Sequence, residues 1–161
     1  MNTPRKQVLI YTDGGCDPNP GPGGYGVVLL YGPHRKELAN GYRRTTNNRM
    51  EIMAAIAGLE LLKPPCEVTL FSDSEYLVNA MRKGWASRWR ANQWRRADRQ
   101  PAANPDLWET LLQLCERHTV TFEWLKGHAG DVENERCDQL AMAARLKNDL
   151  LPDPGYPEGG D

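Results

Sequence analysis

The chain has 161 residues, the length of about one domain, which is enough for a single hydrophobic core. Hydrophobic residues make up 40% of it, charged residues 25%, and its net charge is -1, which excludes a disordered chain and a membrane-embedded one. Its four cysteines lie far apart without a Cys-x-x-Cys pair, which favours reduced, packed thiols over a zinc site or a disulfide framework. Residues 1–6 lead directly into a strand without a secretory signal, so we expect a cytoplasmic protein.

The first part of the chain predicts three strands joined by hairpins. Residues 8–12 form a short apolar run that ends at Asp13, and the glycines and prolines over 14–24 predict a loop. Residues 25–31 are apolar and partly β-branched, a Gly-Pro pair then breaks the run, and residues 37–43 predict a weaker third strand.

Helices and strands alternate in the remainder. Residues 50–62 are apolar nearly all round, as in a buried helix, and later helices are predicted from residue 72 to about 83, from 104 and from 131 to about 147. Residues 68–71 and 120–125 predict strands. This order predicts an α/β fold with one five-stranded mixed sheet, three antiparallel strands followed by two parallel ones, and helices on both faces. We expect one domain over residues 1–148 and a mobile tail over 149–161.

Four carboxylates lie far apart in the chain, yet each falls where a strand ends or near a helix start: Asp13, Glu51, Asp73 and Asp138. Acids gathered in a cleft repel one another and raise one another's pKa unless cations neutralise them. Magnesium binds such hard oxygen ligands and activates water. The pattern therefore predicts a magnesium site.

Each acid also has a purely structural explanation. Asp13 before two glycines is typical of a turn, and Glu51 would stand at the third helical position after an Asn48 N-cap, where a glutamate closes a capping box. Asp73 would start a helix within a second capping box. Asp138 would be a solvated acid that pairs with Arg145 or a lysine two residues further on. These four explanations would have to coincide if no common site existed.

Six short motifs give the chain a recognisable signature. They are Tyr11-Thr12-Asp13-Gly14, Asn19-Pro20-Gly21-Pro22-Gly23-Gly24-Tyr25-Gly26, Thr45-Thr46-Asn47-Asn48-Arg49-Met50-Glu51, Ser72-Asp73-Ser74, Lys126-Gly127-His128-Ala129-Gly130 and Glu133-Asn134-Glu135-Arg136-Cys137-Asp138. On these motifs the chain resembles the bacterial type 1 ribonucleases H over about residues 7–146.

The resemblance implies a ribonuclease H-like fold and endonucleolytic cleavage of the RNA strand of RNA/DNA hybrids, leaving 3'-hydroxyl and 5'-phosphate ends. It implies that the four acids hold two magnesium ions roughly 4 Å apart, with manganese as a substitute. His128, flanked by glycines, would assist proton transfer or product release; the alternative is an exposed, passive histidine. The resemblance also implies a monomer.

Uncharged polar residues near the acids are assigned by the same resemblance to substrate contact: Asn19, Thr46, Asn47 and Asn48. Amide and hydroxyl groups suit this role because they can bond the 2'-hydroxyl that distinguishes RNA from DNA without reading a base. The alternative for Asn47 and Asn48 is helix capping.

A basic segment over residues 82–99 concentrates positive charge that the net charge conceals, with a single acid and three tryptophans among its seven basic residues. We assign Arg90, Arg95 and Arg96 to phosphate contacts, and Trp85 and Trp94 to substrate binding. The helical spacing of Trp85 and Trp89 also fits packing.

Two departures from the enterobacterial pattern of the family stand near the predicted site. Glu75 replaces a glutamine that contacts substrate, and would be a fifth acid there; Asp131 replaces a histidine and is predicted to cap a helix. Two alternatives remain open: a nonenzymatic hybrid-binding module of the same fold, and an integrase-like phosphoryl transferase. Concentrated negative charge disfavours a pure nucleic-acid binder.

Overall fold

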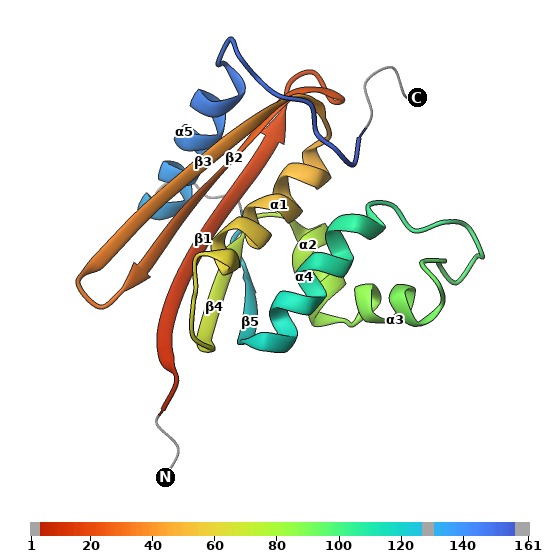
Figure 1. Cartoon of the computed structure of the whole chain (residues 1–161), viewed down its shortest axis with the longest axis horizontal. Helices are drawn as coiled ribbons and strands as arrows, with labels where there is room; N and C mark the ends of the chain where they lie inside the picture. Colours follow the sequence, from red (N-terminus) through yellow and green to blue (C-terminus); the bar gives the residue numbers. More distant parts are fainter. Residues whose placement is uncertain (1–3, 127–130, 157–161) are drawn as a thin grey trace.

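One mixed sheet forms the centre of the computed structural model, which describes residues 4–126 and 131–156. Its strands are β1 (Lys6–Cys16), β2 (Gly21–Tyr31), β3 (His34–Thr45), β4 (Cys66–Ser72) and β5 (Thr119–Trp124), in the order β3-β2-β1-β4-β5 (Figure 1). The pairs β1–β2 and β2–β3 are antiparallel, whereas β4 lies parallel to both β1 and β5. The predicted five-stranded mixed sheet is confirmed.

The first hairpin is longer than the sequence predicts. Residues 14–16 and 21–24 were expected in a loop, but Gly14 pairs with Tyr25 and Cys16 with Gly23, so both strands continue through the glycines. Ladder hydrogen bonds use backbone groups and need no apolar side chain, which is why hydrophobic periodicity does not reveal this extension. The longer β1 carries Asp13 within the strand rather than in a turn.

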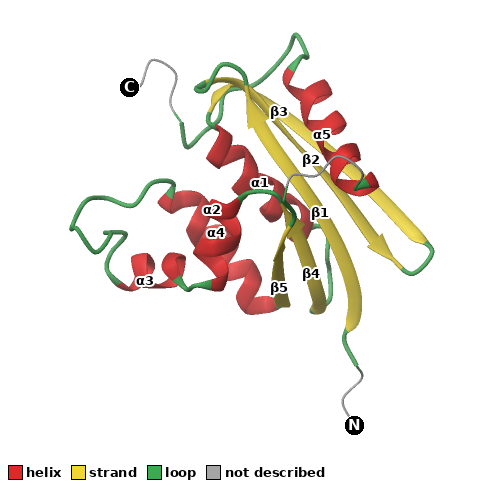
Figure 2. Ribbon diagram, turned by 180° about the vertical axis from the view of Figure 1, so that it is seen from behind, coloured by secondary structure: helices red, strands yellow, loops and turns green. Residues whose placement is uncertain are grey.

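Helices cover both faces of the sheet, as predicted. They are α1 (Asn47–Glu60), α2 (Glu75–Arg82), α3 (Trp85–Ala91), α4 (Pro105–Arg117) and α5 (Val132–Arg145). Helix α5 packs alone on β1, β2 and β3, while α1 packs on β1 and β2 from the other side and against α4 (Figures 1 and 2). Helix α1 is buried nearly all round, with Met50, Ile52 and Leu59 fully enclosed. Within the described residues, no helix has the length and apolar character needed to cross a lipid bilayer.

Residues 149–156, expected to belong to a mobile tail, pack against the domain. The Arg43 N–H donates to the Leu151 carbonyl at 2.9 Å. The Asp153 side chain is fully buried and accepts hydrogen bonds from Arg49 Nε and the Thr45 hydroxyl, both at 2.7 Å. A segment held by polar contacts has no apolar periodicity, so its composition alone suggests disorder. The rest of the expected tail, residues 157–161, lies outside the described residues.

Candidate active site

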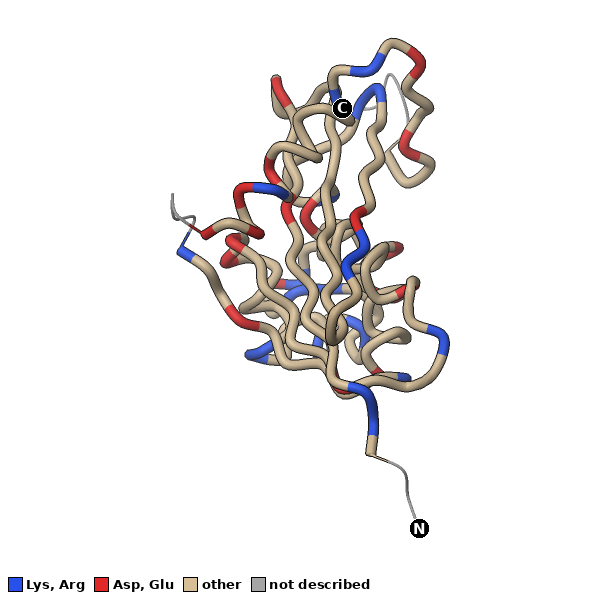
Figure 3. Tube along the Cα trace, turned by 90° about the vertical axis from the view of Figure 1, so that its left-hand side faces the viewer, with Lys and Arg blue, Asp and Glu red and all other residues tan. Residues whose placement is uncertain are grey.

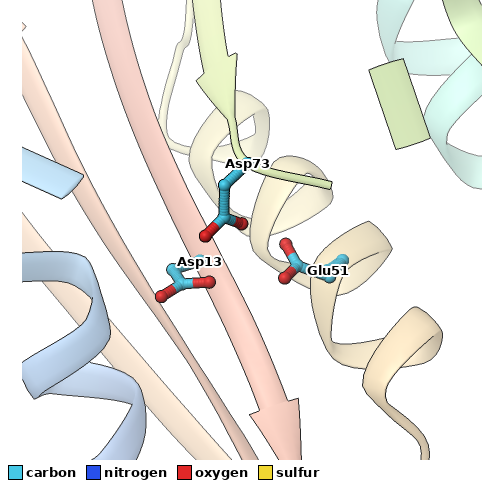
Figure 4. Close-up of side chains that lie close together, drawn as sticks. All are labelled: Asp13, Glu51 and Asp73. Carbon is cyan, nitrogen blue, oxygen red and sulfur yellow. The ribbon is translucent and has the colours of Figure 1, made fainter. Parts of the chain in front are cut away.

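Three of the four predicted acids converge at one edge of the sheet. Because Tyr11 of β1 pairs with Phe71 of the parallel strand β4, Asp13 and Asp73, each two residues further on, extend from the same edge. Glu51 reaches them from α1 (Figure 4). One carboxylate oxygen from each of the three residues lies within 4.8 Å of the others.

Gly14 allows β1 and α1 to approach closely enough for this contact. A Cβ atom added at Gly14 would lie 2.5 Å from the Met50 carbonyl carbon and 2.8 Å from the Glu51 nitrogen, both in the helix backbone. A helix backbone cannot yield locally as a flexible side chain can, so any larger residue would push α1 away from the strand. The glycine therefore sets the separation between Asp13 and Glu51.

The capping role considered for Glu51 is wrong. Helix α1 begins two residues earlier than an Asn48 cap requires: Thr46 is the N-cap, and its hydroxyl accepts the Arg49 N–H at 3.2 Å. Glu51 is instead buried, and its Oε2 atom has no hydrogen-bond partner. A buried carboxylate oxygen without a partner costs free energy, so something other than capping accounts for this glutamate.

The second capping box, around Asp73, is also not formed. The N-cap of α2 is Ser74, whose hydroxyl accepts the Leu77 N–H at 3.1 Å. The Ser72 hydroxyl instead accepts a hydrogen bond from the Ser74 N–H at 3.0 Å, and Glu75 is the first residue of α2. The Asp73 carboxylate is thereby left to face the other two acids.

Burial raises the pKa of all three clustered acids, and the charge of a neighbouring carboxylate adds to each rise. Burial first, and then the charge of Asp73, raise the pKa of Asp13 to about 7, although the Gly14 N–H donates to its Oδ1 at 2.9 Å. Burial also raises the pKa of Asp73, and burial with the charge of Asp13 raises that of Glu51. The hard oxygen donors and the unpartnered Glu51 oxygen fit a divalent cation. Such a cation would offset the repulsion between the carboxylates and give the Glu51 oxygen a partner.

Asp138, the fourth predicted acid, lines the same cleft without joining the tight group. It projects from α5 as an exposed side chain, and its charge adds to the rise in pKa of Asp13 and Asp73. The cleft has a volume of about 490 Å³. Its lining comprises Asp13, Gly14, Gly15, Cys16, Asp17, Asn47, Asn48, Glu51, Asp73, Ser74, Asp138, Ala141, Met142 and Arg145.

The predicted polar contact residues join the end of β1 to the start of α1. Asn47 Oδ1 accepts the Cys16 N–H at 2.8 Å, and Asn19 Oδ1 accepts the Asn47 N–H at 3.2 Å. Asn47 and Asn48 are exposed and line the cleft beside the acids, whereas Thr46 caps the helix. Neither asparagine is the N-cap of α1, and the Asn47 side chain instead holds the end of β1 through its Oδ1.

The basic segment forms a separate surface around α3. Its hollow is lined by Trp85, Arg88, Trp89, Asn92, Arg95, Arg96, Ala97 and Asp98, and shares no residue with the acidic cleft. The ring centroids of Trp85 and Trp89 lie 6.5 Å apart, and that of Trp89 lies 6.0 Å from that of Trp108 in α4. This packing supports a structural role for Trp85 and Trp89. Trp94 is likewise partly buried against the core.

Two of the three arginines assigned to phosphates are bound to acids. Arg90 Nη1 lies 3.2 Å from both Glu109 and Glu116, and Arg96 lies 2.9 Å from Asp98. Arg95 Nη1 donates to the Arg99 carbonyl at 3.3 Å, a neutral partner. Arg95 is therefore the member of this set with its full charge left for a phosphate.

The remaining predictions have mixed outcomes. Glu75 is exposed and lies outside both the acid cluster and the cleft lining, so the structure does not make it a fifth acid of the site. Asp131 caps α5 as predicted, accepting the Asn134 N–H at 2.9 Å. His128 lies outside the described residues, and its role stays a prediction.

Several cleft residues were not assigned to the site from the sequence, among them Met142, which was not considered, and Arg145, which was weighed only as a partner of Asp138. Both belong to α5 and line the cleft with Asp138 and Ala141. Positions 138, 141, 142 and 145 follow the helical spacing of one face, so the signal was available once Asp138 was placed in a site.

The chain is similar to a known enzyme family over nearly its whole length. A fold with three acids gathered at one sheet edge defines a class of α/β enzymes suited to binding divalent cations. The RNase H family model matches residues 5–145. The chain is 68% identical to a "Ribonuclease H" of Syntrophus aciditrophicus over 96% of this chain and 89% of that one. It is 59% identical to a "Ribonuclease HI" of Synechocystis over 97% and 98%. The chain therefore belongs to the ribonuclease H family of enzymes.

Solved structures of RNase H1 proteins are similar to this chain in fold. LC9-RNase H1, described as a type 1 RNase H with the type 2 active-site motif, matches with a TM-score of 0.79 at 28% identity, over 90% of this chain and 74% of that one. LC11-RNase H1 in complex with RNA/DNA hybrid matches with a TM-score of 0.66 at 25% identity, over 85% and 95%.

Proposed function

We propose that this chain is an endonuclease that hydrolyses the RNA strand of RNA/DNA hybrids, largely without sequence preference, and leaves 3'-hydroxyl and 5'-phosphate ends. The observation that carries the proposal is the group of three carboxylates within 4.8 Å, one of them buried with an unpartnered oxygen. Family membership and the hybrid bound to the similar LC11-RNase H1 support the choice of substrate.

Asp13, Glu51 and Asp73, with Asp138 from the facing helix, would hold two divalent cations, magnesium or manganese. Bound there, the cations would lower the pKa of an attacking water and stabilise charge on the leaving 3'-oxygen. The chain's own contribution is to keep the ligands in place: Gly14 sets the distance between strand and helix, and Thr46 fixes the first turn of α1. Rigid ligands cost little reorganisation when the substrate arrives.

The polar residues beside the acids would orient the RNA strand. Asn47 and Asn48 present amides to the cleft, which suits bonding to 2'-hydroxyl groups. The Asn19 side chain accepts a hydrogen bond from the Asn47 backbone N–H and so helps to fix the position of the Asn47 side chain. His128 would assist proton transfer or product release. We further propose that the protein acts as a cytoplasmic monomer.

Cleavage of defined substrates tests the proposal. Purified protein is incubated with end-labelled RNA/DNA hybrid, double-stranded RNA and duplex DNA, with magnesium or with EDTA, and the product ends are analysed. We expect cleavage of the hybrid alone, in magnesium alone. The Asp13→Asn variant should lose at least a hundredfold in rate, whereas Asp149→Asn, the same change at an exposed site, should not.

Three results would contradict the proposal or part of it. Hybrid binding without cleavage under any divalent cation would favour the nonenzymatic module. Strand joining or transfer in place of hydrolysis would favour the integrase-like enzyme. An Asp13→Asn variant within a few-fold of the wild-type rate would refute the ligand assignment.

A further inference from the structure

One face of α5 forms a wall of the acidic cleft and carries opposite charges at its two ends. Asp138, Ala141, Met142 and Arg145 line the cleft in succession. The acid lies near enough to the clustered carboxylates for its charge to act on Asp13 and Asp73, and the arginine lies two helical turns further along. Seven residues at about 1.5 Å each separate them by roughly 10 Å along the helix axis. The wall therefore has a cationic end at a defined distance from the predicted cleavage centre.

Among the described residues that line this cleft, Arg145 is the single cation. Acidic and basic residues are mixed over the chain trace (Figure 3), and several other arginines are bound to acids. Arg35 and Arg136 pair with Glu37 at 3.1 and 2.8 Å, for example. In the described part of the chain, Arg145 has neither an ion pair nor a side-chain hydrogen bond, although it is only partly exposed.

The end of α5 that carries Arg145 lies close against the sheet beside the cleft. Gly24 and Gly41 let the end of α5 lie directly on the sheet, because an added Cβ at Gly24 would lie 3.0 Å from the Arg145 nitrogen and one at Gly41 would lie 2.6 Å from the Ala144 carbonyl oxygen. Burial raises the pKa of the Cys16 thiol at the end of β1, and the charge of Arg145 partly offsets that rise. The helix end thus faces the end of β1 with no acid bound to the guanidinium.

We propose that Arg145 is a substrate-positioning residue that binds a phosphate of the RNA strand about two or three nucleotides from the scissile phosphate. This inference rests on the proposed function. This spacing takes the RNA strand to run along α5: the roughly 10 Å between Asp138 and Arg145 then spans two to three phosphates at an axial rise of about 3.4 Å per phosphate of one strand. A guanidinium suits the task because its planar fork can donate two hydrogen bonds to one phosphate.

A cation at this distance has a specific consequence for catalysis. It attracts the strand without placing positive charge among the metal ligands, where it would compete with the cations. It also sets which phosphate reaches the carboxylates, because the strand is held at a second point along the wall. Arg145 therefore contributes to substrate binding and register rather than to the chemical step.

Paired variants test this role. Arg145→Gln should raise KM for the hybrid about 5- to 20-fold and change kcat less than 3-fold. The slope of log KM against log salt should become shallower by about one. Arg145→Lys, which keeps the charge, should recover part of the loss. Lys147→Gln is the matched control, because it removes the same charge from an exposed residue just beyond α5 that does not line the cleft.

A second readout does not depend on the metal-loaded enzyme. Fluorescence anisotropy of a labelled hybrid in EDTA should show weaker binding by Arg145→Gln than by Lys147→Gln. Hybrids carrying one neutral methylphosphonate in the RNA strand then locate the contact. A neutral linkage two or three nucleotides from the cleavage site should weaken hybrid binding by the wild-type protein and leave hybrid binding by Arg145→Gln unchanged.

The outcomes separate this inference from the proposed function. If the wild-type protein cleaves hybrids while Arg145→Gln and Lys147→Gln have the same KM, the role of Arg145 is refuted and the function stands. If a methylphosphonate at every position weakens hybrid binding by the wild-type protein and by Arg145→Gln equally, Arg145 does not contact a particular phosphate. That result also overturns the inference. If the wild-type protein does not cleave hybrids at all, the proposed function itself fails.

Discussion

Replacing Asp153 should destabilise the whole domain, although this residue lies near the end of the chain. Its carboxylate accepts hydrogen bonds from Arg49 at 2.7 and 3.2 Å, from the Thr45 hydroxyl at 2.7 Å and from the Gly155 N–H at 3.1 Å. The side chains of Asp153 and Arg49 are 0% and 2% exposed. Asp153→Ala would leave the Arg49 charge buried with only part of its partners.

The expected magnitude follows from the partners that remain. Breaking a buried ion pair from one side costs about 3–5 kcal/mol, and Arg49 would keep its two bonds to Asp106, at 3.0 and 2.8 Å. We therefore expect a loss at the lower end of this range, about 3 kcal/mol in the free energy of unfolding. For a domain of this size each kcal/mol lowers Tm by about 2–4 °C, so Tm should fall by roughly 6–12 °C.

Thermal unfolding followed by circular dichroism checks this prediction, with Asp149→Asn as the control, because Asp149 is an exposed acid of the same segment. The control should melt within about 1 °C of the wild type, as surface changes usually do. If Asp153→Ala also melted within 2 °C of the wild type, residues 149–156 would not be held as the structure shows. A fall equal in both variants would indicate a general charge effect instead.

Three further predictions concern the site. Asp13 has its pKa raised from 3.8 to about 7, so without metal the folded state binds the proton more tightly than the unfolded state, and stability falls as pH rises from about 4 to 7. Asp13→Asn should therefore raise Tm in EDTA at pH 8, with the gain shrinking toward pH 4; a constant gain would refute the repulsion argument. Gly14→Ala should lower kcat at least tenfold by moving α1 away from β1, with little change in hybrid affinity in EDTA; unchanged kcat would show that the helix can yield. Arg95→Ala should raise KM more than Arg90→Ala, because Arg90 is already paired with Glu109 and Glu116; the reverse order would show that those pairs open on binding.

Much of the fold and part of the site could be predicted from local patterns. Gly and Pro breaks between short apolar runs indicated the hairpins, and a long stretch that is apolar nearly all round indicated the buried helix that became α1. Asp13 and Asp73 could be paired in advance, because parallel strands place their ends at one edge of a sheet. These features depend on neighbours a few residues apart, which a sequence displays directly.

Adjacent candidates for one role were harder to separate. Thr46, Asn47 and Asn48 can all cap a helix, and only the position of α1 against β1 decided for Thr46. That choice moved Glu51 out of a capping box and into the acid cluster.

By itself, the sequence determined the acids, the family signature and the order of the strands and helices other than α3, because these follow from residue types at short spacing. Only the tertiary structure decided which charges meet. Asp153 lies 104 residues from Arg49 in the chain, and Arg90 lies 26 residues from Glu116, so no local pattern could pair them. Likewise, Arg145 became a cation of the cleft because α5 lies on the sheet beside Asp13, and electrostatic partners are selected by distance in space.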